Sequence, residues 1–169
     1  SCEISYSPAT RSSVCSTDST SSRTSFDEVA PMWASTAVIV VAADHGEGLD
    51  GHGEKTHGLF LYQSTVQVPL LIEASGRWPA GTRVDQPVTL ADVVPTLLTL
   101  AGVPVPPGLD GTDLGPAVSG SVLARREVYA ESYLPLLQFR FSPLTMLRSG
   151  RLKYIDAPKA ELYDLAEDG

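Results

Sequence analysis

One uninterrupted apolar segment, followed directly by polar residues, restricts the fold of this chain more than any other feature. Ala37 to Ala43 is a continuous run of apolar, mostly β-branched residues, which is the pattern of a strand buried on both faces in a largely parallel sheet. Asp44, His45 and Gly46 follow at once, at the carboxyl end of the strand, where open α/β sheets bind their ligands. The segment therefore predicts an α/β fold with polar groups at one edge of a mostly parallel sheet.

Two further segments extend this α/β core. Residues 68–73 form a second apolar strand candidate. Residues 90–101 carry leucine and valine at helical spacing. Because Pro95 is tolerated only in the first turn of a helix, we place Asp92 at the N-cap and the helix at about residues 93–101. We expect a partial sheet with flanking helices.

The C-terminal part of the chain has a different pattern. Short strand-like runs occur at residues 127–130, 144–148 and 152–155, and Ser149-Gly150-Arg151 between the last two is typical of a hairpin turn. These runs predict a small antiparallel sheet.

The composition divides the chain into three parts. The first 25 residues contain 14 Ser or Thr, and such a segment buries too little apolar surface to offset its ordering entropy. We therefore expect a low-complexity, disordered segment over residues 1–36, an α/β core over residues 37–120 and an antiparallel subdomain over residues 121–169.

The net charge limits the possible partners. A formal charge of −8 at pH 7 disfavours nucleic acid and anionic membrane surfaces, which repel a negative protein. The longest apolar run, residues 37–43, is far shorter than the ~20 residues that cross a bilayer. We expect no nucleic-acid partner and no membrane span, and the sequence does not indicate a compartment.

A cluster of imidazoles and carboxylates follows the first strand. All three histidines of the chain lie in one short glycine-rich window, together with several acidic residues and one lysine; these residues are Asp44, His45, Glu47, Asp50, His52, Glu54, Lys55 and His57. Carboxylate oxygens and neutral imidazole bind divalent cations. A solvated polar loop explains the same composition equally well, so the residues alone leave both interpretations open.

An ordered series of motifs favours the first interpretation. It runs through Val40–Gly48, His52–Glu54, Thr56–Tyr62, Val68–Ile72, Leu90–Leu98, Leu109–Gly111, Leu147–Tyr154 and Glu161–Leu165. This series resembles the second half of the sulfatase family, in the alkaline-phosphatase-like superfamily, over roughly residues 37–169. The resemblance implies a sulfuric ester hydrolase that acts on a small-molecule or saccharide sulfate ester.

The resemblance also implies roles for particular residues. Asp44 and His45 match the second pair of metal ligands of the family, which implies a divalent metal, Ca²⁺ in preference to Mg²⁺ or Mn²⁺. His57 lies where family members place a Lys or His that contacts the sulfate group, and Lys55 is the alternative. Asp92 is expected to be a helix cap and not a ligand.

The catalytic residue of the family is not found in this chain. Sulfatases use a Cys/Ser-x-Pro-x-Arg motif whose first residue is oxidised to formylglycine, and the nearest text here, Tyr6 to Arg11, does not match it. We therefore expect a C-terminal portion of a sulfatase that is inactive alone and able to self-associate through its truncated sheet.

Two other functions stay open. One is a phosphodiesterase or phosphonate monoester hydrolase of the same superfamily, which the upstream motif would distinguish. The other is a non-catalytic remnant with at most weak anion binding.

Overall fold

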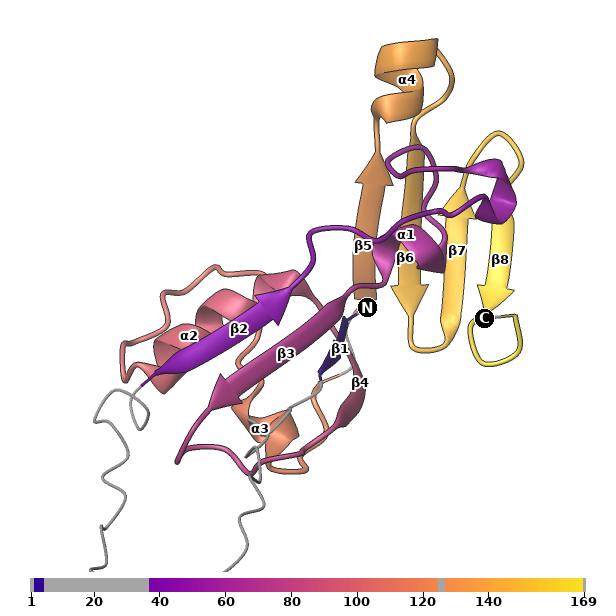
Figure 1. Cartoon of the computed structure of the whole chain (residues 1–169). Coiled ribbons are helices and arrows are strands. Elements are labelled where there is room, and N and C mark those ends of the chain that lie inside the picture. The colour runs from indigo at the N-terminus through magenta and orange to yellow at the C-terminus, as the bar shows by residue number, and fades with distance from the viewer. Residues whose placement is uncertain (1, 5–36, 125–126, 169) are drawn as a thin grey trace, which may run out of the picture.

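The computed structural model describes residues 2–4, 37–124 and 127–168, which form two four-stranded sheets (Figure 1). The first sheet has the strand order β2-β3-β1-β4, and the second has the order β5-β6-β7-β8. The strands of the first sheet are β1 (Cys2–Ile4), β2 (Val38–Ala42), β3 (Pro69–Ala74) and β4 (Val84–Val88). Of the predicted disordered segment, residues 2–4 form β1, and residues 1 and 5–36 lie outside the described residues.

The first sheet corrects the prediction of a mostly parallel arrangement. β1 and β3 are parallel, but β2 and β3 are antiparallel, as are β1 and β4. The prediction rested on the continuous apolar composition of the strands, and that composition does not encode direction. The chain leaves β2, turns back and returns as its antiparallel neighbour β3, with Val40 opposite Ile72.

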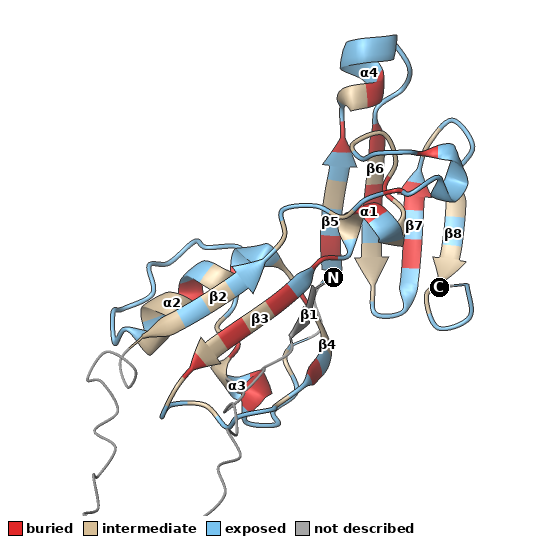
Figure 2. Cartoon of the chain, in the orientation of Figure 1, coloured by how far each residue is buried: buried red, intermediate tan, exposed pale blue. Residues whose placement is uncertain are grey.

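The strand β2 is less buried than its composition predicts. Among the described residues it is the outermost strand of the first sheet, and only one of its faces packs against the core. Val38 and Val40 pack against the core, whereas Ile39 and Val41 are 51% and 56% exposed (Figure 2). The prediction of a strand buried on both faces was wrong because periodicity alone does not show whether both faces are covered.

The core of the first sheet is completed by two helices, α2 (Val93–Leu100) and α3 (Gly115–Val118). Its buried residues are Val68, Leu70, Ile72, Val84, Val88, Leu114, Ala117 and Val118. The predicted helix is thus present and ends one residue earlier than expected.

Asp92 is a structural residue, as predicted, although its contacts differ from those of a simple N-cap. A short 3₁₀ turn, Leu90–Asp92, precedes α2, and Thr89 and Asp92 form a capping box at its start. The buried Asp92 carboxylate accepts the backbone N–H of Thr89 at 2.7 Å and that of Thr112 at 2.8 Å. It therefore ties the start of the helix to the distant loop before α3.

The second sheet confirms the predicted antiparallel arrangement. Its strands are β5 (Glu127–Ser132), β6 (Leu144–Ser149), β7 (Leu152–Asp156) and β8 (Glu161–Asp164), each antiparallel to the next. The helix α4 (Leu134–Phe139) connects β5 to β6.

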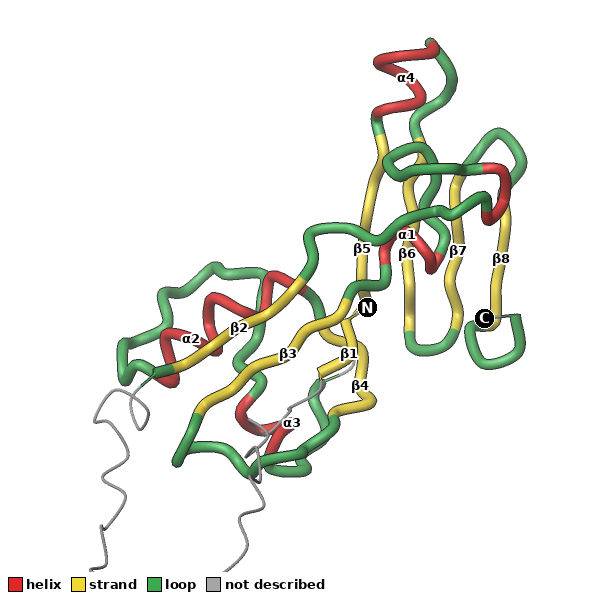
Figure 3. The backbone as a smooth tube through the Cα atoms, viewed as in Figure 1, coloured by secondary structure: helices red, strands yellow, loops and turns green. Residues whose placement is uncertain are grey.

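The long connection between β2 and β3 joins the two sheets. It leaves the first sheet, runs across the second and returns, as the tube in Figure 3 shows. On the way it forms a 3₁₀ turn, Gly51–Gly53, and the helix α1 (Gln63–Val66). Leu61 of this connection is buried in the second core with Val128, Leu144, Met146 and Ile155. The packing therefore fixes the position of the histidine-containing segment.

Among the described residues, no helix combines the length and hydrophobicity that a bilayer crossing requires.

Candidate metal and anion site

A cavity of about 480 Å³ opens where β2 ends, and its walls come from distant parts of the sequence. One wall is formed by residues that follow β2, including Asp44, His45 and His57, and the other by residues 130–134 at the junction of β5 and α4. The structure thus brings together three of the four predicted site residues. Lys55 is exposed and does not line this cavity.

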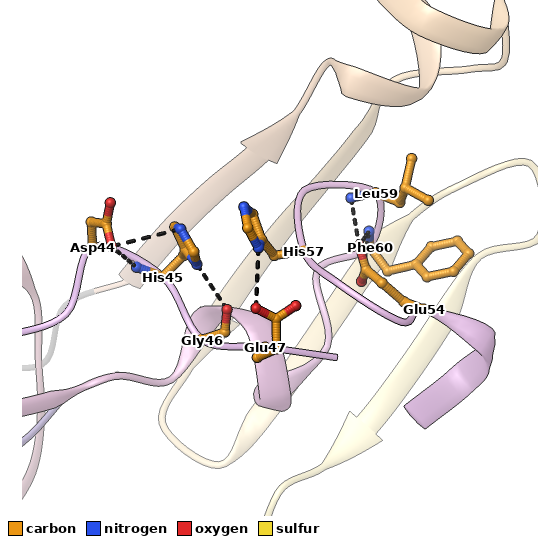
Figure 4. Close-up of polar contacts among 8 residues, drawn as sticks. All are labelled: Asp44, His45, Gly46, Glu47, Glu54, His57, Leu59 and Phe60. Atoms are coloured by element: carbon orange, nitrogen blue, oxygen red, sulfur yellow. Dashed lines mark hydrogen bonds and ion pairs between the residues drawn. The ribbon is translucent and has the colours of Figure 1, made fainter. Parts of the chain in front are cut away.

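Asp44 and His45 present a carboxylate and an imidazole to the same space (Figure 4). Oδ1 of Asp44 lies 3.7 Å from Nε2 of His45 and accepts the backbone N–H of His45 at 3.0 Å. Nδ1 of His45 lies 2.8 Å from the carbonyl oxygen of Gly46. Because a carbonyl oxygen only accepts, Nδ1 donates the hydrogen, and Nε2 has a free lone pair whenever the ring is uncharged. An acceptor oxygen and an acceptor nitrogen therefore lie side by side.

His57 lies against His45. The two rings stack with their centroids 3.7 Å apart and an angle of 23° between their planes. Nδ1 of His57 is 3.4 Å from Oε2 of Glu47, which orients the ring (Figure 4). Glu47 therefore holds one nitrogen of the His57 ring.

The loop that carries His57 is organised by a buried carboxylate. Glu54 is 2% exposed, and its Oε1 accepts the backbone N–H of Leu59 at 2.7 Å while its Oε2 lies 3.3 Å from the backbone nitrogen of Phe60 (Figure 4). A carboxylate that accepts several backbone N–H groups fixes the loop around it. The sequence analysis did not predict that Glu54 organises this loop. An acidic residue just before a turn is nevertheless a recognised sign of hydrogen bonding from the backbone to a side chain.

Two glycines after β2 allow close contact between backbone segments of the connection. Gly46 donates its N–H to Thr65 at 2.8 Å, and a Cβ at Gly46 would lie 2.0 Å from the carbonyl oxygen of Ser64. A Cβ at Gly48 would lie 2.4 Å from the carbonyl oxygen of Glu54. Any side chain at either position would force the backbone apart, so glycine is required here.

The second wall of the cavity was not predicted. The Ser132 hydroxyl at the end of β5 donates to the carbonyl oxygen of Gly58 and so holds the His57 segment against the second sheet. Glu131 and Tyr133 also line the cavity. Glu131 accepts the hydroxyl of Tyr129 at 2.8 Å, and this hydrogen bond raises the pKa of Tyr129. Ser132 is 74 residues from Gly58 in the sequence, and no local sequence pattern connects this wall to the histidine-containing segment.

His52 lies outside the cavity that contains the other two histidines. Its ring stacks on that of Tyr62 at 3.7 Å, with 15° between the planes. His52 therefore contacts an aromatic ring of the same connection and not the cavity of the candidate site.

Within the described residues, no group of three or more His, Cys, Asp or Glu side chains is arranged to hold a metal ion. Oδ1 of Asp44 and Nε2 of His45 are 3.7 Å apart, a separation that two ligand atoms of one divalent cation can have. A complete shell needs further oxygen ligands.

Comparison with known proteins shows which family this part of the chain is similar to. Residues 25–103 match the sulfatase family model. This segment belongs to the sulfatase family. The match includes β2, the histidine-containing connection and β3, and so covers all four predicted site residues.

Individual sulfatases are similar over a longer stretch. The chain is 30% identical over 137 residues to a Δ4,5-hexuronate-2-O-sulfatase of Bacteroides thetaiotaomicron, covering 78% of this chain and 28% of that enzyme. It is 29% identical over 142 residues to rat arylsulfatase K, covering 78% of this chain and 25% of that enzyme. The chain therefore spans about a quarter of the length of these sulfatases.

A solved structure of a related hydrolase has a similar fold. The phosphonate monoester hydrolase of Silicibacter pomeroyi superposes with a TM-score of 0.64 at 27% identity, covering 78% of this chain and 29% of that one. The sulfatase segment thus has a fold that also occurs in an enzyme of phosphonate chemistry.

Proposed function

We propose that this chain supplies one side of the divalent-metal and sulfate site of a sulfuric ester hydrolase. Asp44 and His45 are the proposed metal ligands, and Ca²⁺ is the proposed ion. The observation that carries the proposal is the convergence of Asp44 Oδ1 and His45 Nε2 at 3.7 Å on a cavity that also contains His57. Mg²⁺ and Mn²⁺, which also take carboxylate oxygen ligands, are the alternatives.

His57 is the proposed contact for the sulfate group. It lines the cavity beside His45, and the carboxylate of Glu47 holds its Nδ1. A protonated imidazole donates a charge-assisted hydrogen bond to an anionic oxygen. Lys55, the alternative predicted from the sequence, is exposed outside the cavity lining, which favours His57.

The bound metal would neutralise the charge of the sulfate oxygens during transfer. The residues of this chain would position the groups of the site. Asp44 and His45 would place the metal-binding oxygen and nitrogen at the end of a strand, and Glu54 would hold the loop that carries His57. The nucleophile, expected to be formylglycine in the parent enzyme, is not encoded by a recognisable motif here. We therefore propose that the 169-residue chain does not turn over a sulfate ester by itself, and we expect it to self-associate through the exposed edge of β2.

A saccharide sulfate ester is the proposed substrate class, because the bacterial relative is named as a hexuronate sulfatase. The alternative is a phosphonate monoester, which the structural similarity to the Silicibacter pomeroyi enzyme favours. A sulfate monoester and a phosphonate monoester carry the same single negative charge but differ in the groups bonded to sulfur or phosphorus, so competition between non-hydrolysable analogues of the two esters at the cavity distinguishes the proposals.

Calorimetric titration with Ca²⁺, in the presence and absence of sulfate, tests the site. We expect weak binding that sulfate strengthens and that Asp44→Asn abolishes. Asp50→Asn is the matched control, because Asp50 lies in the same connection but does not line the cavity. Equal loss of binding in both variants, or no binding by a folded chain, would refute the proposal.

A further inference from the structure

A second cavity, of about 250 Å³, lies between α1 and the second sheet and contains a buried lysine in its wall. Lys153 of β7 is only 1% exposed. The residues that line this cavity are all different from those that line the candidate metal site. The cavity therefore needs an explanation of its own.

Within the part of the chain that the structure describes, no carboxylate pairs with the buried ammonium group of Lys153. Among the residues that the structure describes, its Nζ donates one hydrogen bond, to the neutral amide oxygen Oε1 of Gln63 at 2.9 Å. In the strand register, Lys153 is directly opposite Arg148 of β6. Burial without a carboxylate partner, next to a second cation, disfavours the charged form of an amine.

The protonation of Lys153 follows from this environment. Burial, and to a lesser extent the charge of Arg148, lowers the pKa of Lys153 to about 8. At pH 7 this makes the neutral fraction of its amine on the order of 100-fold larger than that of an ordinary lysine. A neutral amine in a cavity is a nucleophile.

The walls of the cavity favour a flat, uncharged ligand. Tyr62 and Tyr163 meet edge to face with centroids 6.2 Å apart, and His52 stacks on Tyr62. Both tyrosine hydroxyls donate to Glu161, so the two rings offer mainly their carbon surfaces. The carboxylate of Asp168, which also lines the cavity, disfavours an anion. Aromatic rings prefer to stack on such surfaces.

We propose that Lys153 is a reactive amine that forms an imine with small, uncharged aromatic aldehydes in this cavity. The nitrogen lone pair attacks the carbonyl carbon, the C=O π pair moves to oxygen, and a proton passes from nitrogen to that oxygen. The carbinolamine then loses water and leaves a C=N bond. Cyanoborohydride traps it by delivering hydride to the imine carbon, which gives a stable secondary amine.

The chain contains its own reference groups for the test. Lys55 and Lys159 are its other lysines, and both are exposed. The full chain is treated with benzaldehyde and cyanoborohydride near pH 7, digested with a protease that does not cut at lysine, and analysed by mass spectrometry. We expect Lys153 to be modified at least ~10-fold faster than either exposed lysine, because its neutral fraction is much larger.

A second variant separates chemical reactivity from simple accessibility. Gln63→Glu keeps the length of the hydrogen-bonding side chain and gives Lys153 a negative partner, which stabilises the ammonium form. We expect modification of Lys153 to fall at least ~5-fold while Lys55 and Lys159 are unchanged. Modification of Lys153 in the folded wild-type chain no faster than that of the exposed lysines would overturn the proposal, as would an unchanged rate in a folded Gln63→Glu chain.

Discussion

The imidazole rings of His45 and His57 lie face to face, 3.7 Å apart, although they are on opposite arms of the connection between β2 and β3. His45 is held by the carbonyl oxygen of Gly46 and His57 by Glu47. A displacement of either ring would disturb the other. The proposed metal ligand and the proposed sulfate contact are therefore coupled through direct contact.

The first prediction separates His57 from Lys55. Since a hydrogen bond to a charged group contributes about 1.5–3 kcal/mol, His57→Ala should reduce the effect of sulfate on Ca²⁺ affinity by about 10-fold or more. Lys55→Ala should leave it nearly unchanged, because Lys55 does not line the cavity. Calcium titrations at matched ionic strength measure both, and the reverse ranking would assign the sulfate contact to Lys55.

The second prediction concerns the buried carboxylate of Glu54. Glu54→Gln replaces one acceptor oxygen by an NH₂ group that faces the backbone N–H groups of Leu59 and Phe60. Unsatisfied buried donors cost about 1–3 kcal/mol, and the free energy of unfolding should fall by that amount in urea denaturation. Glu167→Gln, at an exposed position, is the control and should change little.

The third prediction compares two glycines. Gly46→Ala places a methyl group against the carbonyl oxygen of Ser64, whereas a Cβ at Gly51 meets nothing within 4 Å. Because overpacking typically costs about 1–3 kcal/mol, the first variant should lower the thermal midpoint clearly and the second should not. Similar midpoints for the two variants would show that the loop does not approach as closely as described.

The fourth prediction concerns pH. The pKa of Lys153 is lowered to about 8 in the folded chain, so the unfolded chain binds more protons above pH 8 and the stability rises with pH. The gain should be roughly 1–2 kcal/mol between pH 8 and pH 9.5. Lys153→Met should remove this rise in urea titrations. Above pH 10 the trend should reverse, because the raised pKa values of Tyr62 and Tyr163 make the folded chain retain protons that the unfolded chain loses.

The fifth prediction tests the structural role of Asp92. Asp92→Asn should cost about 1–3 kcal/mol, since one of the backbone N–H groups of Thr89 and Thr112 loses its acceptor. Asp110→Asn, at an exposed position of the following loop, should be neutral. Ca²⁺ binding by Asp92→Asn, measured on the folded fraction, should be unchanged. Loss of that binding would instead favour a ligand role for Asp92.

The elements that the sequence predicted correctly are those set by local patterns. Residues 68–73 and 93–101 carry their strand and helix signals in neighbouring residues, and the Ser149–Arg151 turn fixes the hairpin of β6 and β7. The direction of β2 was not predictable in this way. It depends on where the following connection returns, and an apolar strand has the same composition in parallel and antiparallel sheets.

The same limit applies to the candidate site. Asp44, His45 and His57 are close in sequence, and their common location followed from the motif series. Ser132 and Glu131 reach the cavity only through packing of the second sheet, which no spacing encodes. Lys153 was missed for a different reason, because lysine is rarely fully buried and its position was interpreted only as part of a strand.

The glycine contacts beside β2 have a consequence for how such a site can change. Because Gly46 and Gly48 leave no room for even a methyl group, the turn that carries the acidic and imidazole groups is closed to gradual remodelling by substitution. Substitutions that change the proposed site are therefore expected on the opposite wall, where Tyr133 is exposed. Mutagenesis of the proposed site should therefore randomise that wall and leave the strand end unchanged.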